Sequence, residues 1–246
     1  MITGAFRYAL YLVPERQSLL WQIGSSLLGY DSITGENIPQ PVVDGVAPEQ
    51  LAAQTAEPRR YGFHLTVKAP FRLAEGCSIE GLVEAAQTLA CDFPALSLGA
   101  LRLKVRRTRA QTDGFICLEP REMPDSLAAL ERAIVIGTDR FRASLTSEEI
   151  ARRSPDRLTP RQRTLLDRFG SGSITVRLNR FGYPFVLDEF RPHFSLTGNI
   201  GEGGCCLAGF EALLGPALQE APRLRYRLAL FSQREAGETF RLERVL

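Results

Sequence analysis

The chain has 246 residues, 44% of them hydrophobic and 24% charged, which is ordinary for a globular protein with one large domain or two lobes that share a core. Thirty basic residues are nearly balanced by 28 acidic ones, so the net charge of +2 gives no global positive field for duplex nucleic acid. No apolar run approaches the length of a transmembrane helix, the first residues do not resemble a signal peptide, and the five cysteines show neither CxxC spacing nor a zinc pattern. We therefore expect a cytoplasmic protein.

Hydrophobic periodicity and turn residues define the elements of the first half. These are a strand at 5–13, a helix at 14–29, a loop at 31–48, a short helix at 48–56, a strand at 61–71, a helix at 78–90 and a hairpin of 96–108 with 115–118. The loop is long enough to cover a cleft, although a plain surface excursion explains it equally well. In the hairpin, Arg102, Lys104 and Arg106 alternate with apolar residues, which gives a basic strand face that is either solvated or in contact with phosphate.

The second half ends with the same order of strand, helix and hairpin as the first. It comprises a helix at 124–141, an arginine-rich helical stretch at 146–169, a turn and extra strand at 170–179, a strand within 186–200, a helix at 207–220 and a terminal hairpin of 224–233 with 240–246. The tripeptide Arg-Phe-Gly occurs at 168–170 and again at 180–182, as if a local duplication had been inserted. Strand, helix and hairpin follow one another in both 61–118 and 190–246, which predicts two similar lobes across a shared cleft.

The strand at 61–71, Tyr-Gly-Phe-His-Leu-Thr-Val-Lys-Ala-Pro-Phe, holds one of the two histidines. Side chains alternate along a strand, so His64, Thr66 and Lys68 are predicted to share one face while the apolar residues between them are buried. The strand therefore presents an imidazole, a hydroxyl and an ammonium group in a row.

The other histidine lies in an equivalent pattern at 191–197, Arg-Pro-His-Phe-Ser-Leu-Thr. Here the side chains that share one face are those of Arg191, His193, Ser195 and Thr197. A single His-x-Thr on a strand is more often structural than catalytic. Two copies that use both histidines of the chain in matched contexts are a much more specific signal.

Two imidazoles on opposite sides of a phosphate can hydrolyse a phosphodiester. A neutral imidazole takes a proton from the attacking water or hydroxyl, and a protonated one donates to the departing oxygen. The hydroxyls of Thr66 and Ser195 can donate to the nonbridging oxygens, where negative charge develops. Lys68 and Arg191 are either further phosphate contacts or flanking charges at a strand edge. No carboxylate cluster accompanies either histidine, so we expect no metal and no cofactor.

These residues resemble the paired H-x-T/S motifs of the two-histidine (2H) phosphoesterase superfamily. More closely, the chain is similar to a bacterial branch of it that is often associated with phosphonate-utilisation genes. The segments that carry the resemblance are 6–11, 59–73, 158–163, 182–186 and 189–198.

The resemblance implies an α+β fold: a single bilobal domain over 1–246 with pseudo-twofold symmetry, in which two antiparallel sheets flanked by helices enclose the cleft. It implies metal-independent opening of cyclic phosphodiesters, with His64 and His193 as acid and base in an order that it does not fix. Thr66 and Ser195 would be the phosphate ligands. The motifs lie 129 residues apart, farther than in smaller members, so 120–182 is interpreted as an inserted helical element.

Three functions are compatible with this pattern. The first is hydrolysis of a cyclic phosphodiester on a small ribose-type, nucleotide or phosphonate-pathway substrate. The second is processing or ligation of RNA ends that carry a 2′,3′-cyclic phosphate, which the near-neutral charge disfavours because backbone binding needs a basic groove. The third is a non-catalytic nucleotide- or RNA-binding module, which would not require paired proton-transfer groups. The expected partner is thus a small phosphorylated substrate rather than a membrane.

Overall fold

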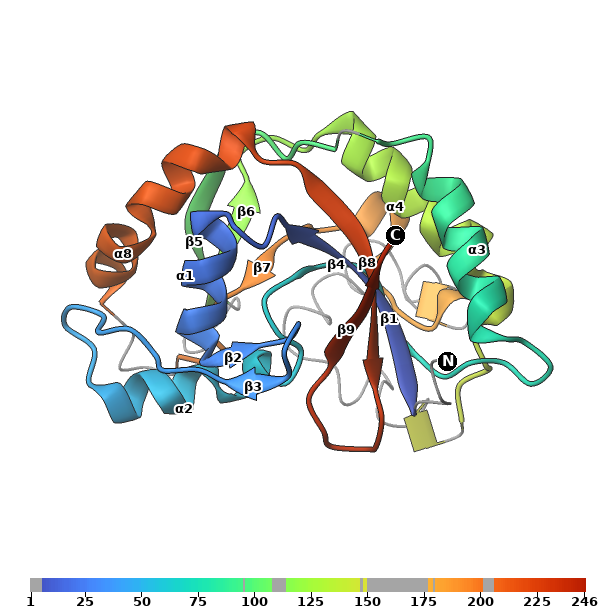
Figure 1. Cartoon of the computed structure of the whole chain (residues 1–246), viewed down its shortest axis with the longest axis horizontal. Coiled ribbons are helices and arrows are strands. Elements are labelled where there is room, and N and C mark those ends of the chain that lie inside the picture. Colours follow the sequence, from blue (N-terminus) through green and yellow to red (C-terminus); the bar gives the residue numbers. More distant parts are fainter. Residues whose placement is uncertain are drawn as a thin grey trace.

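The structure is a computed structural model that describes residues 6–94, 96–107, 114–146, 148–149, 177–178, 180–200 and 206–246. Its centre is one antiparallel sheet of seven strands in the order β5-β6-β7-β4-β1-β8-β9, with helices on either side (Figure 1). The strands are β1 (Arg7–Pro14), β4 (Leu65–Phe71), β5 (Leu101–Arg107), β6 (Gly114–Pro120), β7 (Phe194–Ser195), β8 (Tyr226–Gln233) and β9 (Arg241–Val245). A separate hairpin pairs β2 (Tyr30–Asp31) with β3 (Glu36–Asn37).

The prediction of two separate antiparallel sheets is wrong for the described residues. The two motif strands, β4 and β7, pair directly with each other through Leu65 and Phe194. Both side chains are fully buried, and their packing as cross-strand neighbours joins the two halves into one continuous sheet. The two motifs therefore lie side by side at the centre of the sheet.

The order strand, helix, hairpin is present in both halves, but each hairpin joins the opposite half of the sheet. Hairpin β5–β6 follows the first motif in the chain and pairs with β7, which carries the second. Hairpin β8–β9 follows the second motif and pairs through β1 with β4, which carries the first. The two halves are thus interlocked.

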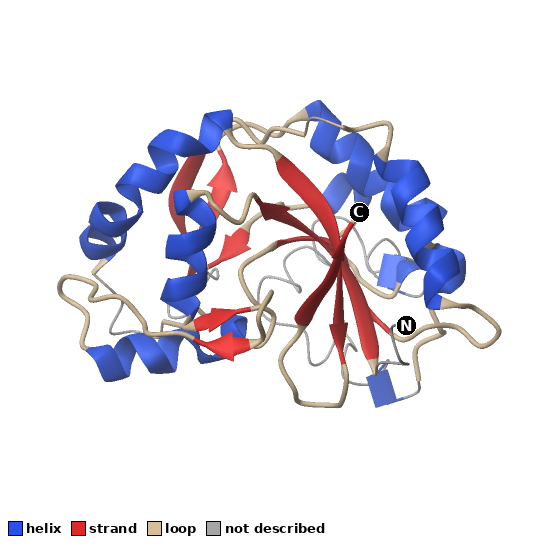
Figure 2. Ribbon diagram, viewed as in Figure 1, coloured by secondary structure: helices blue, strands red, loops and turns tan. Residues whose placement is uncertain are grey.

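The helices are α1 (Leu19–Leu28), α2 (Pro48–Arg59), α3 (Ile79–Ala90), α4 (Asp125–Gly137) and α8 (Leu207–Glu220), with 3-10 turns η1 (Asp139–Phe141), η3 (Leu187–Glu189) and η4 (Ala221–Arg223). Helix α1 begins later than predicted because the chain continues in β1 as far as Pro14, and the hydroxyl of Ser18 then caps the backbone N–H of Trp21. Helices α1 and α8 pack together, as do α3 and α4, and the two pairs lie at opposite sides of the molecule (Figure 2).

The apolar face of the motif strands packs against the helices. Phe63, which precedes β4, stacks on Phe194 with ring centroids 4.9 Å apart. Helix α1 approaches Phe63 so closely at Gly24 that a Cβ there would overlap the ring. Since neighbouring residues on a strand point to opposite faces, the histidines beside these apolar residues point away from α1.

Several sequence predictions concern segments outside the seven-stranded sheet and the helices that pack against it. The loop predicted at 31–48 contains most of the β2–β3 hairpin and contributes no residue to the cavity described below, which favours the plain surface excursion over a cover. Except for residues 146, 148 and 149, the helical stretch at 146–169 lies outside the described residues, as does most of the extra strand at 170–179. The residues described near its end, 177–178 and 180–181, are helical rather than extended. No helix in the described part of the chain is long and apolar enough to cross a membrane.

Candidate active site

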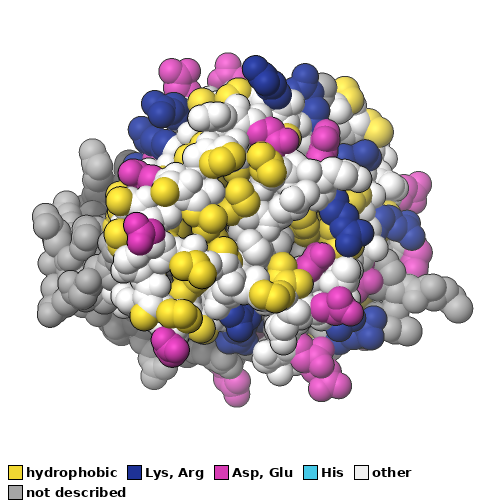
Figure 3. Space-filling view, turned by 60° about the vertical axis from the view of Figure 1, so that its left-hand side comes forward, with side chains coloured by type: hydrophobic (Ala, Val, Ile, Leu, Met, Phe, Trp, Pro, Cys, Tyr) yellow, Lys and Arg dark blue, Asp and Glu magenta, His cyan; other side chains and the backbone are white. Residues whose placement is uncertain are grey.

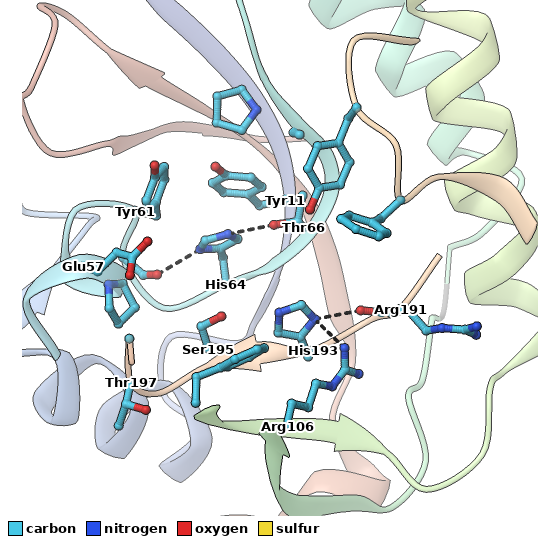
Figure 4. Close-up of a pocket in the computed structure, with 18 of the residues that line it drawn as sticks. Tyr11, Glu57, Tyr61, His64, Thr66, Arg106, Arg191, His193, Ser195 and Thr197 are labelled. Atoms are coloured by element: carbon cyan, nitrogen blue, oxygen red, sulfur yellow. Dashed lines mark hydrogen bonds between the residues drawn. The ribbon is translucent and has the colours of Figure 1, made fainter. Parts of the chain in front are cut away.

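The pairing of β4 with β7 brings together four of the six predicted catalytic and phosphate-binding side chains, those of His64, Thr66, His193 and Ser195. Because Leu65 lies opposite Phe194 in an antiparallel pair, the register places Ser195 opposite His64 and His193 opposite Thr66. All four belong to the sheet face opposite α1 and α4, and all four line one cavity (Figure 4). Each histidine is thus a cross-strand neighbour of the other motif's hydroxyl.

Both imidazoles are held in the same way by their own backbone. His64 Nδ1 lies 2.9 Å from the carbonyl oxygen of Gly62, and His193 Nδ1 lies 2.7 Å from that of Arg191. A carbonyl oxygen only accepts hydrogen bonds, so Nδ1 carries the proton in each ring and Nε2 is the nitrogen that exchanges a proton. At His64 this geometry depends on Gly62, whose φ of 74° is in the left-handed region that favours glycine.

His64 occupies an aromatic and apolar environment. The ring of Tyr11 from β1 stacks on it, with centroids 3.6 Å apart and an interplanar angle of 19°. Burial lowers the pKa of His64 to about 4, opposed by the hydrogen bond to Gly62 and reinforced by nearby His193. His64 is therefore neutral over the physiological range, with Nε2 accepting a hydrogen bond from the Thr66 hydroxyl at 3.0 Å.

His193 occupies a more polar environment. Arg106 from β5 extends across β6, and its Nη1 lies 3.4 Å from His193 Nδ1. The Arg106 guanidinium is held by Glu119, with Nη2 to Oε2 at 2.7 Å and Nε to Oε2 at 3.2 Å. The ring centroid of Phe115 from β6 lies 5.4 Å from that of His193. The second imidazole is thus flanked by a fixed positive charge.

The cavity between the motifs has a volume of about 600 Å³. Six aromatic side chains contribute to its walls: Tyr11, Tyr61, Phe115, Tyr183, Phe185 and Phe190. Glu57, Thr197 and Asn199 supply polar groups at its border. Apolar walls with a few polar groups are typical of a small-molecule site, and this volume is sufficient for a ligand larger than a single phosphate.

The structure places Lys68 away from this cavity, so the prediction that it shares a face with His64 and Thr66 is wrong. Tyr11 pairs with Thr66 but Leu10 pairs with Lys68, which leaves Val67 as an extra residue in β4. Such a β-bulge interrupts the alternation of faces. Lys68 is consequently buried on the helix side.

The buried ammonium group of Lys68 has polar partners there. Lys68 Nζ donates to the carbonyl oxygen of Val135 in α4 at 3.2 Å and lies 3.9 Å from Asp139. Burial lowers the pKa of Lys68 to about 8, against the opposing effect of Asp139. These contacts give Lys68 a structural role between the sheet and α4.

Arg191 does line the cavity, but its backbone makes the closer contact with the site. Its carbonyl oxygen orients His193, whereas its guanidinium is half exposed and lies 3.6 Å from Glu189. Figure 4 shows this side chain directed away from the two histidines. Thr197 is buried and accepts a hydrogen bond from the backbone N–H of Ile116 at 2.9 Å, so its hydroxyl is engaged within the fold.

Sequence reasoning missed two groups of the site. Tyr11 lies in a strand whose aromatic and branched residues predict only burial, and nothing in its sequence context indicates a partner. Arg106 belongs to the predicted basic strand face, but its link to His193 depends on the pairing of β5 with β6 and of β6 with β7. Both contacts join residues that are far apart in the chain.

The described residues contain no group of three or more His, Cys, Asp or Glu side chains that could hold a metal ion. Metal independence stays a prediction.

Comparison with known proteins identifies the family. A family model described as "Protein of unknown function (DUF1045)" matches residues 66–176 and 171–241. The chain belongs to this family. The match includes Thr66, His193 and Ser195, and no solved structure matches the chain.

Two curated relatives are both called "Ribose 1,5-bisphosphate phosphokinase PhnN". The protein from Laribacter hongkongensis (strain HLHK9) is 32% identical over 244 residues, which is 98% of this chain and 51% of the relative. The protein from Janthinobacterium sp. (strain Marseille) is 36% identical over 191 residues, which is 78% of this chain and 38% of the relative. The chain thus spans about half of the length of one relative and 38% of the other.

Proposed function

We propose that this chain is a phosphoesterase that opens a small cyclic phosphodiester by general acid–base catalysis between His64 and His193. The observation that carries the proposal is the arrangement of these two imidazoles beside Thr66 and Ser195 on one face of the sheet, in a shared cavity. The resemblance to the two-histidine phosphoesterases gives the same reaction class. Neither the family description nor the relatives' printed name assigns it.

In the proposed mechanism, His64 is the base because its environment keeps it neutral. Its Nε2 takes a proton from water as the water oxygen attacks phosphorus, and the bond from phosphorus to one ring oxygen of the substrate breaks. His193, protonated at Nε2, donates its proton to that oxygen, which becomes a hydroxyl group. The product is a phosphomonoester. The starting state returns when His64 releases the proton it gained to solvent and His193 takes up a proton from solvent.

Thr66 and Ser195 stabilise the charge that develops on the nonbridging oxygens. The Thr66 hydroxyl donates to His64 without substrate, so substrate binding must turn this hydroxyl towards the phosphate. Preorganised donors at developing charge are usually the larger catalytic contribution. The Tyr11 ring that covers His64 also limits the access of water to that side.

We further propose that the substrate is a ribose-type phosphate. The relatives are named for a ribose bisphosphate, and the resemblance points to a phosphonate-associated branch. The sequence contains no Gly-x4-Gly-Lys-Ser/Thr phosphate-binding loop, since its two lysines are Lys68 and Lys104 and neither follows glycine. We therefore attribute the kinase name to parts of the relatives that lie outside the matched region.

The alternative of RNA end processing has less support. On the face shown in Figure 3, basic and acidic side chains are interspersed and do not form a continuous basic track. A non-catalytic binding module would not need two imidazoles whose Nδ1 atoms are each fixed by a carbonyl oxygen. These alternatives predict different results in one experiment.

The test is hydrolysis of a panel of cyclic phosphodiesters, both ribose-type and nucleoside-type, in the presence of a chelator. We expect turnover by the wild-type chain and a loss of roughly 10²–10⁴-fold in kcat for His64→Ala and for His193→Ala. A matched control is Arg244→Ala, an exposed residue on β9 outside the cavity. Full activity in both histidine variants would refute the mechanism. Tight binding of these compounds without turnover would favour the binding module.

A further inference from the structure

A cluster of charged residues extends from the active-site cavity along β5. Arg102, Lys104 and Arg106 all contact the single carboxylate of Glu119, at 2.7, 2.8 and 2.7 Å respectively. We call these four residues the β5 basic cluster. Three positive charges converge on one negative charge, so the cluster by itself retains a net charge of +2.

The β5 basic cluster lies on the same sheet face as the catalytic side chains. Lys104 pairs with Cys117, and Cys117 pairs with Ser195, so the three residues form a row across β5, β6 and β7. Neighbouring strands are about 4.8 Å apart, which places the backbone of Lys104 roughly 10 Å from that of Ser195. Arg106 bridges this interval, since it lines the cavity and contacts His193.

The members of the cluster differ in exposure. Glu119 and Arg106 are nearly buried, with side chains 7% and 11% exposed, whereas Arg102 and Lys104 are 46% and 45% exposed. The inner pair, Glu119 and Arg106, is therefore held in place within the fold, and Arg106 lines the cavity. The outer pair, Arg102 and Lys104, presents cationic groups to solvent farther along the same strand. Hydrogen bonds from Lys104, Arg106 and Arg102 outweigh the effect of burial on Glu119 and lower its pKa to about 2. Glu119 is therefore ionised at neutral pH and organises the three cations.

A solvated basic strand is the simplest alternative, because charged residues usually lie on the surface. That alternative does not explain why three cations on one strand share one carboxylate when one of them, Arg106, also lines the cavity that contains the two histidines. An anionic ligand would relieve the repulsion among the cations, and arginine binds phosphate through paired hydrogen bonds. The cavity is also larger than one phosphate requires.

We propose that the β5 basic cluster binds a second phosphate of the substrate, a phosphomonoester on the same sugar whose cyclic phosphodiester lies between His64 and His193. This inference rests on the proposed function, and it defines the substrate class as a ribose-type cyclic phosphate with an additional phosphate group. The relatives' printed name, which refers to a ribose with two phosphates, agrees with this class. Arg102 and Lys104 determine this specificity, and Arg106 lies between the two phosphates.

The test is a calorimetric comparison of the binding of ribose 5-phosphate and ribose 1,5-bisphosphate to the wild-type chain and to Arg102→Gln/Lys104→Gln. We expect the wild type to bind the bisphosphate about 10-fold or more tightly than the monophosphate, with a preference that falls as salt rises. The double variant should lose this preference. The matched control Arg227→Gln/Arg244→Gln removes the same charge from exposed residues on β8 and β9, at the opposite edge of the sheet, and should retain it.

Thermal melting first establishes that each variant is folded. Retention of the preference in Arg102→Gln/Lys104→Gln, loss of it in the control, or no measurable binding of the bisphosphate to the wild type would overturn the inference. Binding is measured without turnover, so this result is independent of the histidine experiment. A chain that binds the bisphosphate through the cluster but hydrolyses no cyclic phosphodiester would refute the proposed reaction and leave the second phosphate site intact.

Discussion

The two histidine motifs share their local geometry but differ in their surroundings. In each, Nδ1 is fixed by the carbonyl oxygen two residues earlier, and a hydroxyl follows two residues later on the same face. Around His64 the neighbours are aromatic, with Tyr11 stacked on the ring. Around His193 the neighbours include the guanidinium of Arg106, itself anchored by Glu119.

The repeated motif and the neighbouring strands contribute different groups to the site. The repeat places an imidazole and a hydroxyl at equivalent positions on two paired strands. The added neighbours make the two halves chemically unequal: one imidazole is kept neutral in an apolar setting, and the other lies beside a positive charge. An acid–base pair requires opposite protonation states. Burial accounts for the neutral state of His64, whereas the positive charge of Arg106 opposes protonation of His193 and does not by itself supply the acid.

After the histidine substitutions, the largest expected effect tests the equivalence of the two hydroxyls. Thr66→Val and Ser195→Ala should each lower kcat by roughly 10²–10³-fold, because each removes one donor to the developing charge. Thr66→Ser retains the hydroxyl and should keep most of the activity. Steady-state kinetics on the best cyclic phosphodiester measures these effects. A loss below about 10-fold in either variant would contradict the assignment of that hydroxyl and break the symmetry between the halves.

A smaller effect tests the apolar side of the comparison. Tyr11→Leu admits water to His64, so the pKa of this histidine should rise from about 4 towards its ordinary value near 6.5. Since the neutral form is the base, kcat/KM should then begin to fall below about pH 6.5 rather than near pH 4. Tyr11→Phe keeps the stacked ring and serves as the control. If kcat/KM of Tyr11→Leu fell with decreasing pH at the same point as that of the wild type, the group whose protonation causes this fall would not be His64.

The smallest effect on activity is expected at Lys68, only two residues beyond Thr66. Lys68→Met should change kcat and KM by less than about threefold, because the bulge at Val67 turns this side chain away from the cavity. Its consequence should appear in stability, since Lys68 contacts α4 and lies near Asp139. Kinetics and thermal melting of the same variant separate the two roles. A large increase in KM would restore Lys68 as a phosphate ligand.

The sequence was sufficient to predict most of the helices and strands, and to predict that histidine and hydroxyl share one strand face within each motif. Helices α3 and α8 and the terminal hairpin lie close to where hydrophobic periodicity predicts them. The interval of two residues between histidine and hydroxyl places both on one face of a strand, because this alternation is a local property of an extended backbone. The same reasoning fails at Lys68, because one extra residue in β4 reverses the alternation and no local signal marks it.

The contacts between the motifs depend on the tertiary structure. Direct pairing of β4 with β7 converts two similar patterns, 129 residues apart, into one site on a single sheet instead of two facing sheets. Tyr11 contacts His64 because β1 lies beside β4, and Arg106 contacts His193 because β6 joins β5 to β7. The order of strands follows from long-range packing, which a periodic pattern in the sequence does not encode. The sequence by itself determined which groups perform the proposed chemistry, through residue type and spacing. The tertiary structure decided which imidazole is surrounded by aromatic rings and which by charge, because those neighbours come from distant strands.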